Sequence, residues 1–203
     1  MPSLSPITTE INLRVEYCKN QSIIHAVLNR GERVLGEKSM LATQTNPNGL
    51  LLEPGEGSSY WVLGDLYTFK TISKNTKGTY SLMEITVYPQ TGSPPHIHSR
   101  EDESFFILSG EIEFQVNGET MIADPGTFIY SPKGQTHLFT NISNKPARML
   151  CWVIPAGLEQ FFMEIGTLVT DPTAPPPPVT AADIQKTIAL APSYGLTILP
   201  PEQ

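Results

Sequence analysis

The sequence predicts an all-β fold in which short antiparallel strands form a sandwich or a barrel. From Ser59 onward, short segments rich in Val, Ile, Tyr, Phe and Thr each end at Gly, Pro, Asn or Asp, which is typical of strands separated by turns. Proline supplies 19 of the 203 residues, about twice its average share. Because proline is excluded from helix interiors, this composition disfavours a helical bundle.

One hairpin can be placed residue by residue. Ile112, Phe114 and Val116 alternate with polar residues, so we expect one face of this strand on a core and the other in water. Asn117 and Gly118 follow directly, and this pair tolerates the positive φ angles of a two-residue hairpin turn. By the same criteria the expected strands are 60–63, 66–72, 79–88, 104–108, 111–116, 120–123, 127–130, 137–141 and 148–154.

The remaining segments are interpreted as additions to this β core. Residues 1–50 show no sustained period of two or 3.6 and are expected to form an N-terminal extension or arm. Residues 51–155 hold the strands and form the expected barrel domain. Residues 156–203 are expected to pack on the barrel with short helices and a proline-rich tail. One helix is predicted over 158–168, and a second from a Thr180–Asp183 capping box to about 190.

Charge and cysteine content exclude several function classes. The formal net charge of −7 offers no basic surface to a nucleic acid. Cys18 and Cys151 are the only cysteines, too few for a disulfide scaffold, which fits a reducing compartment. No stretch is long and apolar enough for a secretory or membrane segment, so we expect a cytoplasmic protein that binds neither membrane nor nucleic acid.

Three of the four histidines lie in two short segments. His96 and His98 are two residues apart, so an extended chain would point both imidazoles to the same face. Glu103 follows closely, and His137 begins a later predicted strand. A His-x-His pair alone is equally consistent with two surface or core histidines. Three nitrogens and one oxygen together, however, suit a divalent transition metal such as Zn, Mn, Fe, Ni, Co or Cu.

Two longer patterns contain these residues. The fixed positions of the first are His96, His98, Glu103 and Gly110, and those of the second are Gly126, Pro132, Gly134, His137 and Asn141. Residue types and spacings resemble the two signature motifs of the cupin superfamily. The one departure is a glycine expected six positions before the first histidine, where this chain has Gln90, with Gly92 nearby.

The resemblance implies a cupin-type double-stranded β-helix, a jelly-roll barrel with an N-terminal extension and one or two short C-terminal helices. It also implies one divalent transition metal per chain, held in the barrel mouth by His96, His98, Glu103 and His137. The motif spacing favours Glu103 over its acidic neighbours; Asp102 is the next candidate, and Glu101 is expected to be solvated. The motif glycines and proline are expected in turns, and Asn141 at a strand end.

The segment 155–162 and the Tyr194-Gly195 tail extend the resemblance to single-domain cupins similar to quercetin 2,3-dioxygenases. This implies a metal-dependent dioxygenase of a small aromatic or enolic, flavonol-like substrate, in which Glu103 can also serve as the catalytic general base. Two alternatives stay open: a cupin that binds a metal or small ligand without turnover, and a non-redox enzyme such as an isomerase.

Period-two projection places Phe105 and Ile107 on the face of Glu103, and Phe139 on the face of His137. These side chains can form an apolar substrate pocket, or they can be ordinary barrel-core residues. A homodimer is expected as well, because a barrel of this kind leaves sheet edges that need cover.

Overall fold

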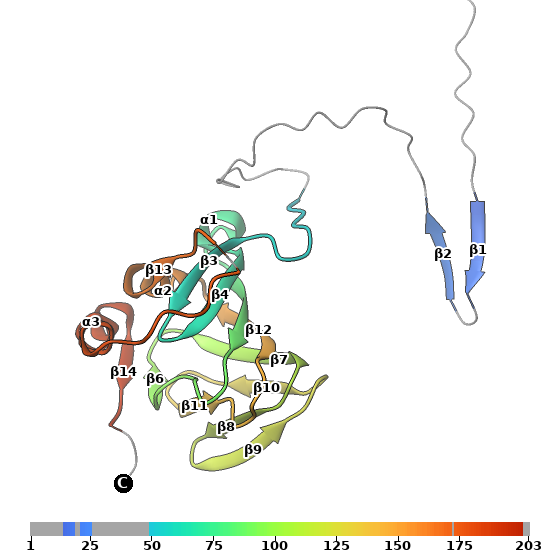
Figure 1. Ribbon diagram of the computed structural model, residues 1–203. Helices are drawn as coiled ribbons and strands as arrows, with labels where there is room; N and C mark the ends of the chain where they lie inside the picture. Colours follow the sequence, from blue (N-terminus) through green and yellow to red (C-terminus); the bar gives the residue numbers. More distant parts are fainter. Residues whose placement is uncertain (1–13, 19–20, 26–48, 172, 201–203) are drawn as a thin grey trace, which may run out of the picture. The chain divides into compact units, whose positions relative to one another are not determined.

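The computed structural model describes residues 14–18, 21–25, 49–171 and 173–200 (Figure 1). The chain divides into two compact units, Met1–Ser39 and Met40–Gln203. In the first unit the described residues form an antiparallel pair, β1 (Arg14–Cys18) and β2 (Gln21–His25). Of the expected N-terminal extension, residues 1–13, 19–20 and 26–48 lie outside the described residues. Every element named below belongs to the second unit.

Seven antiparallel strands form one sheet of the second unit, in the order β10-β7-β12-β5-β4-β3-β13. Their bounds are β3 (Ser58–Val62), β4 (Asp65–Thr71), β5 (Ser81–Val87), β7 (Asp102–Ser109), β10 (Phe128–Ser131), β12 (Ala147–Ile154) and β13 (Thr167–Leu168). The strands predicted over 79–88 and 148–154 are confirmed as β5 and β12, and every second residue in each is buried.

Five further strands form the second sheet, in the order β14-β6-β11-β8-β9. They are β6 (His96–His98), β8 (Ile112–Val116), β9 (Glu119–Ala123), β11 (Thr136–Thr140) and β14 (Leu196–Ile198). The predicted β8–β9 hairpin is confirmed: Asn117 and Gly118 have φ angles of 51° and 84°, and Ile112 pairs with Ala123.

The core lies between the two sheets. Phe105 of β7 packs against Phe114 of β8 and Phe139 of β11, with ring centroids 5.0 and 5.9 Å apart. All three side chains are buried within one apolar cluster that draws on both sheets. The predicted all-β fold of facing antiparallel sheets is therefore confirmed.

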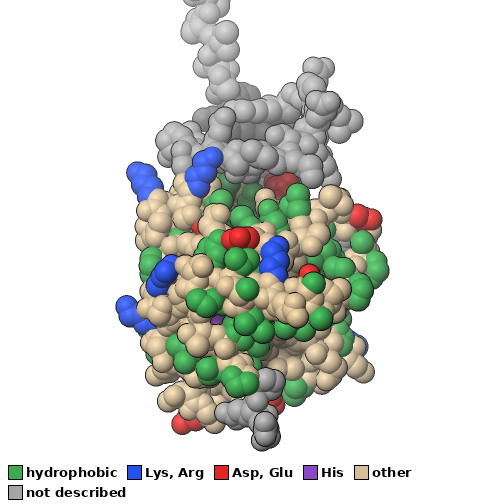
Figure 2. All heavy atoms as spheres, turned by 90° about the vertical axis from the view of Figure 1, so that its left-hand side faces the viewer, with side chains coloured by type: hydrophobic (Ala, Val, Ile, Leu, Met, Phe, Trp, Pro, Cys, Tyr) green, Lys and Arg blue, Asp and Glu red, His purple; other side chains and the backbone are tan. Residues whose placement is uncertain are grey.

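Three short α-helices accompany the sheets: α1 (Ser73–Thr76), α2 (Glu159–Ile165) and α3 (Ala181–Leu190), the last followed by the 3₁₀ turn η1 (Ala191–Tyr194). The Thr180–Asp183 capping box is confirmed, with Thr180 N donating to Asp183 Oδ2 over 2.9 Å. On the face in Figure 2 hydrophobic side chains gather mainly over the middle, and charged side chains are scattered among and around them. In the part of the chain that is described, no helix is long and apolar enough to cross a membrane.

Helix α2 is shorter than the predicted 158–168. It ends at Ile165 because Gly166 turns to an extended conformation, and the chain then pairs with β3 as β13. A Cβ on Gly166 would lie 2.9 Å from Trp61 O, so only glycine permits this close approach. Leu158, Phe161 and Ile165 are buried in the core cluster, which fixes α2 on the barrel.

The loop before β6 accounts for the departure from the cupin motif. Gln90 adopts a φ of 62°, in the left-handed region that favours glycine. Its side-chain amide donates to Ile142 O over 3.2 Å, which ties the loop to the end of β11. Gly92 has a φ of 156°, and a Cβ there would lie 2.0 Å from Phe139 O. The chain thus places its glycine where the backbones approach most closely.

Candidate metal centre

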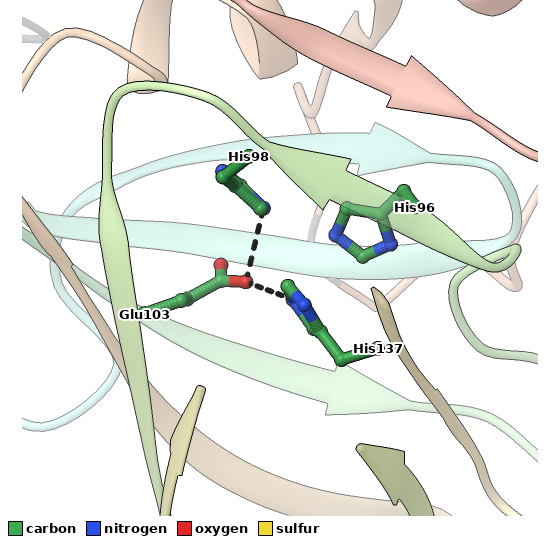
Figure 3. A group of neighbouring side chains, drawn as sticks. All are labelled: His96, His98, Glu103 and His137. Atoms are coloured by element: carbon green, nitrogen blue, oxygen red, sulfur yellow. Dashed lines mark hydrogen bonds and ion pairs between the residues drawn. The ribbon is translucent and has the colours of Figure 1, made fainter. Parts of the chain in front are cut away.

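The three imidazoles come from two neighbouring strands of the five-stranded sheet. His96 and His98 stand two residues apart on β6, and His137 of β11 pairs directly with His96. Glu103 reaches toward them from β7 of the facing sheet (Figure 3). The structure therefore brings together all four residues that the spacing of the sequence had selected.

The four side chains form a compact buried cluster. One potential ligand atom from each lies within 4.8 Å of the others. Glu103 Oε2 is 2.8 Å from His137 Nε2 and 3.3 Å from His98 Nε2. His98 and His137 are each only 2% exposed, and their rings stack at 15° with centroids 5.2 Å apart. The cluster can thus converge on one point shielded from bulk water.

Backbone carbonyls orient two of the imidazoles. Pro94 O accepts a hydrogen bond from His96 Nδ1 over 2.8 Å, and Gln135 O accepts a longer one from His137 Nδ1 over 3.4 Å. Each carbonyl stands two residues before its histidine. Because Nδ1 is the donor in both rings, Nε2 is left to face the cluster.

The electrostatics of the cluster set its charge. Burial lowers the pKa of His96 to about 3, with a further contribution from the neighbouring His137. Burial opposes ionisation of Glu103, but His98 and His137 outweigh it and hold the pKa of that carboxyl well below its usual range. Burial likewise opposes a charged His98, yet Glu103 and Glu101 raise its pKa to about 9. At neutral pH the ionised Glu103 carboxylate therefore lies beside a charged His98 and an uncharged His96.

The donor set fits a divalent transition metal. Imidazole nitrogen and carboxylate oxygen are the ligands that Zn, Mn, Fe, Ni, Co and Cu accept in proteins. Both nitrogens of His98 are buried and have no hydrogen-bond partner among the described residues. Burying an imidazole whose nitrogens have no hydrogen-bond partner costs free energy unless an ion or another group binds them. The four residues thus offer a metal site.

Cys151 adds a contact that the sequence did not indicate. Its buried Sγ donates to Glu103 Oε1 over 3.1 Å, so the thiol meets the carboxylate oxygen that faces away from the histidines. Burial raises the pKa of Cys151 far above its usual range, which keeps it a thiol. The sequence feature that could have indicated this contact is the alternation of buried and exposed residues along β12, which places Cys151 on the inward face of the strand.

The two acids beside Glu103 occupy different surroundings. Asp102 is half-buried, and its Oδ1 accepts from Lys133 N over 2.9 Å, away from the cluster. The expectation that Glu101 is solvated is wrong. Glu101 is only 5% exposed, and its Oε2 lies 3.5 Å from His98 Nδ1.

A cavity of about 50 Å³ adjoins the cluster. His96 and His98 form its polar wall. The rest of the lining is mostly apolar and comes largely from β3, β4, α2 and β14, including Tyr67, Leu158, Phe161, Phe162 and Leu196; its other polar members are Ser93 and Thr187. Tyr67 and Phe162 pack with ring centroids 4.9 Å apart, so α2 closes the cavity against the seven-stranded sheet.

The residues predicted as an apolar pocket lie elsewhere. Phe105, Ile107 and Phe139 are buried core side chains, and none of them is in the lining of this cavity. Phe105 does contact the cluster, since its ring centroid is 6.3 Å from that of His137. Their part in substrate binding stays a prediction, whereas the cavity wall beside the histidines is formed by other residues.

Comparison with known proteins shows which family and which proteins this chain is similar to. Residues 83–153 match the model of the cupin domain family. The chain is 24% identical over 116 residues to a quercetin 2,3-dioxygenase of Bacillus subtilis, a match that covers 57% of this chain and 34% of that protein. It is 28% identical over 141 residues to a probable germin-like protein of Arabidopsis thaliana, covering 64% of this chain and 66% of that protein.

Among solved structures, KdgF from Halomonas sp. matches with a TM-score of 0.49 and 13% identity, over 55% of this chain and 97% of that one. The cupin resemblance drawn from the two motifs is confirmed, because the match to the cupin domain family over residues 83–153 includes both motifs. Within the superfamily the chain is similar to quercetin 2,3-dioxygenases, but it spans only about a third of the length of the Bacillus enzyme.

Proposed function

We propose that His96, His98, Glu103 and His137 bind one divalent transition metal, and that the protein is a dioxygenase of a small aromatic or enolic substrate. The observation that carries the metal site is the convergence of three imidazoles and a carboxylate within 4.8 Å in a buried pocket. The similarity to quercetin 2,3-dioxygenases supports the choice of reaction class.

The protein groups have separate roles in this proposal. A bound metal would supply a Lewis acid that attracts dioxygen and an anionic substrate oxygen. His96 and His137, oriented by Pro94 O and Gln135 O, present Nε2 toward the proposed metal position. The cavity walls exclude water from the substrate, because most of the side chains that line them are apolar.

Glu103 is the proposed proton acceptor as well as a ligand. Its Oε2 faces the histidines, and its Oε1 is occupied by the Cys151 thiol, so Oε2 is the atom that would take the proton. Glu103 is not in the lining of the cavity. A substrate hydroxyl must therefore reach past His96 and His98 to give its proton to Glu103.

The cavity limits the size of the substrate. At about 50 Å³ it is about a third of the roughly 150 Å³ that holds one benzene ring, and it has room for a few waters. A short enol suits this volume. A single aromatic ring enters only if Phe162 or α2 moves outward, and a three-ring flavonol needs a larger movement.

Oxygen consumption tests the reaction class. The protein is stripped of metal, reloaded in turn with Mn, Fe, Ni, Co, Zn or Cu, and supplied with short-chain enols, catechols or flavonols. Consumption above the metal-only rate is expected with at least one pair of metal and enol. Metal binding without oxygen consumption for any substrate would instead favour a binding cupin, or an isomerase if the substrate is converted.

Glu103→Gln separates the two roles of this residue. The amide oxygen can still ligate but cannot accept the proton, so we expect most of the metal to be retained and turnover to fall by about 10²–10⁴-fold. The control is His137→Ala, which removes a ligand and is expected to lose metal and turnover together. Equal turnover in Glu103→Gln and wild type at matched metal occupancy would remove the base from the proposal.

Phe162→Ala tests the cavity as the substrate site. Without this ring the cavity is larger. We therefore expect the KM for a catechol to fall relative to the KM for a short enol. Phe128 is 60% exposed and outside the cavity lining, so Phe128→Ala is the matched control. The same KM ratio in both variants would place the substrate elsewhere.

A further inference from the structure

The three histidines of the cluster differ in what their outward nitrogens face. His96 and His137 each direct Nδ1 to the carbonyl two residues earlier in the chain. His98 has no such partner, and its Nδ1 lacks any hydrogen bond among the described residues. Metal-bound histidines almost always donate their second N–H to a carboxylate, a carbonyl or water. The orientation of His98 therefore requires a further group.

Glu101 is the group in position to supply it. Its Oε2 is the carboxylate oxygen 3.5 Å from His98 Nδ1, on the side of the ring opposite Glu103. Oε2 is itself buried and has no hydrogen-bond partner in the described structure. A shortening of about 0.6–0.8 Å would give a charge-assisted hydrogen bond of ordinary length. Two unpartnered buried polar atoms, one a donor and one an acceptor, thus face each other.

We propose that Glu101 is a positioning residue of the metal centre. Its carboxylate accepts the Nδ1 proton of His98 and so aims His98 Nε2 at the point where Nε2 of the other two rings converges. The inference rests on the proposed metal site, which it deepens. It assigns a carboxylate to the one imidazole that has no backbone acceptor.

The cost of burial supports this pairing. A carboxylate removed from water without a partner is strongly destabilising, so a buried glutamate needs a donor. Asp102, the next residue, satisfies its own carboxylate at Lys133 N near the surface. The chain thus turns the side chain of Glu101 inward to His98, and that of Asp102 outward to Lys133.

The first test reads the pairing itself by nitrogen-15 NMR of the histidine rings. If Glu101 accepts from His98 Nδ1, that nitrogen carries the proton in the neutral ring as it does in the charged ring, so wild type should show a protected His98 Nδ1–H signal, with and without Zn²⁺. Glu101→Ala should lose that protection while the signals of His96 and His137 are retained. An unprotected His98 Nδ1–H in wild type, or the same signal in Glu101→Ala, would overturn the proposal even if metal binds.

The second test is the affinity for Zn²⁺ alone, by calorimetry on metal-free protein. Glu101→Ala should bind Zn²⁺ about 10–100-fold more weakly than wild type, as expected for loss of an outer carboxylate. Glu101→Gln keeps an acceptor oxygen and should recover most of the affinity, which a merely structural role would not predict. Asp102→Asn removes the same charge one residue away and should stay within about twofold.

Different results would refute the role of Glu101 and the metal site itself. Wild type that binds no Zn²⁺ would refute the metal site and leave the NMR signal of His98 to decide the pairing. Wild type that binds Zn²⁺ no more tightly than Glu101→Ala would refute the role of Glu101 and leave the metal site intact.

Discussion

Glu159 offers a test of how the cavity wall is held. This glutamate, fully buried at the start of α2, accepts through Oε1 from the backbone N–H and the hydroxyl of Ser73, and through Oε2 from Gly157 N over 2.8 Å. In Glu159→Gln one acceptor oxygen becomes a donor, so either Ser73 or Gly157 loses its partner. One lost charge-assisted bond plus one unsatisfied donor costs about 3 kcal/mol.

The assay is thermal unfolding as a function of pH. A loss of about 3 kcal/mol lowers Tm by about 6–12 °C in a chain of this size. Burial opposes ionisation of Glu159, but the hydrogen bonds from Ser73 and Gly157 outweigh it and lower its pKa. Its contribution is therefore complete above the unfolded pKa of about 4.3 and is lost as the pH falls through the folded pKa. The difference in stability between wild type and Glu159→Gln should therefore shrink as the pH falls from the unfolded pKa toward the lower folded pKa.

Glu164→Gln is the control on the same helix. Glu164 is exposed and accepts from the Tyr194 hydroxyl, so the free energy of unfolding should change by no more than about 0.5 kcal/mol. A Glu159→Gln protein with the Tm of wild type at pH 7 would refute the anchoring of α2. So would a difference in stability that persists undiminished at pH 3.

Four further outcomes are expected. Saturating Zn²⁺ at about 100 times Kd should add about 2.7 kcal/mol to the free energy of unfolding of wild type and nothing to His137→Ala, measured by chemical denaturation. Burial raises the pKa of Asp65 to about 7, so wild type pays an increasing ionisation cost between about pH 4 and 7, and Asp65→Asn should gain stability relative to it over that range; a flat difference would contradict this. Asn141→Ala removes four hydrogen bonds made by a fully buried amide, two donated to Val87 O and Lys145 O and two accepted from Ser143, and should cost about 3 kcal/mol in urea unfolding. The expected homodimer is checked by sedimentation, where a mass of one chain at micromolar concentration would contradict it.

Local pattern was sufficient for most of the β core. Apart from β6, the strands between 60 and 154 were predictable, because the residue pattern of each strand and the turn residues at its ends are local features of the sequence. The two- and three-residue strands β6, β13 and β14 were not, since their pairing depends on distant partners. The end of α2 was misplaced for the same reason, because the close approach of Trp61 to Gly166 is a tertiary contact.

The cluster was predictable and its surroundings were not. The spacing of His96, His98, Glu103 and His137 selected four side chains that the fold brings together. The spacing of residues along the chain does not indicate how far a side chain is buried. Glu101 was therefore expected to be solvated, although the structure buries it. The cavity wall was missed because it is assembled from β3, β4, α2 and β14, segments far apart in the chain.

The pairing of β14 with β6 joins the tail of the chain to its chemistry. Leu196 lies opposite His98 and Ile198 opposite His96, and both apolar side chains also line the cavity. Strand β14 thus borders both the candidate metal site and the cavity. Any coupling between a ligand in the cavity and a metal at the cluster would be reciprocal: the factor by which the ligand changes the affinity for the metal equals the factor by which the metal changes the affinity for the ligand.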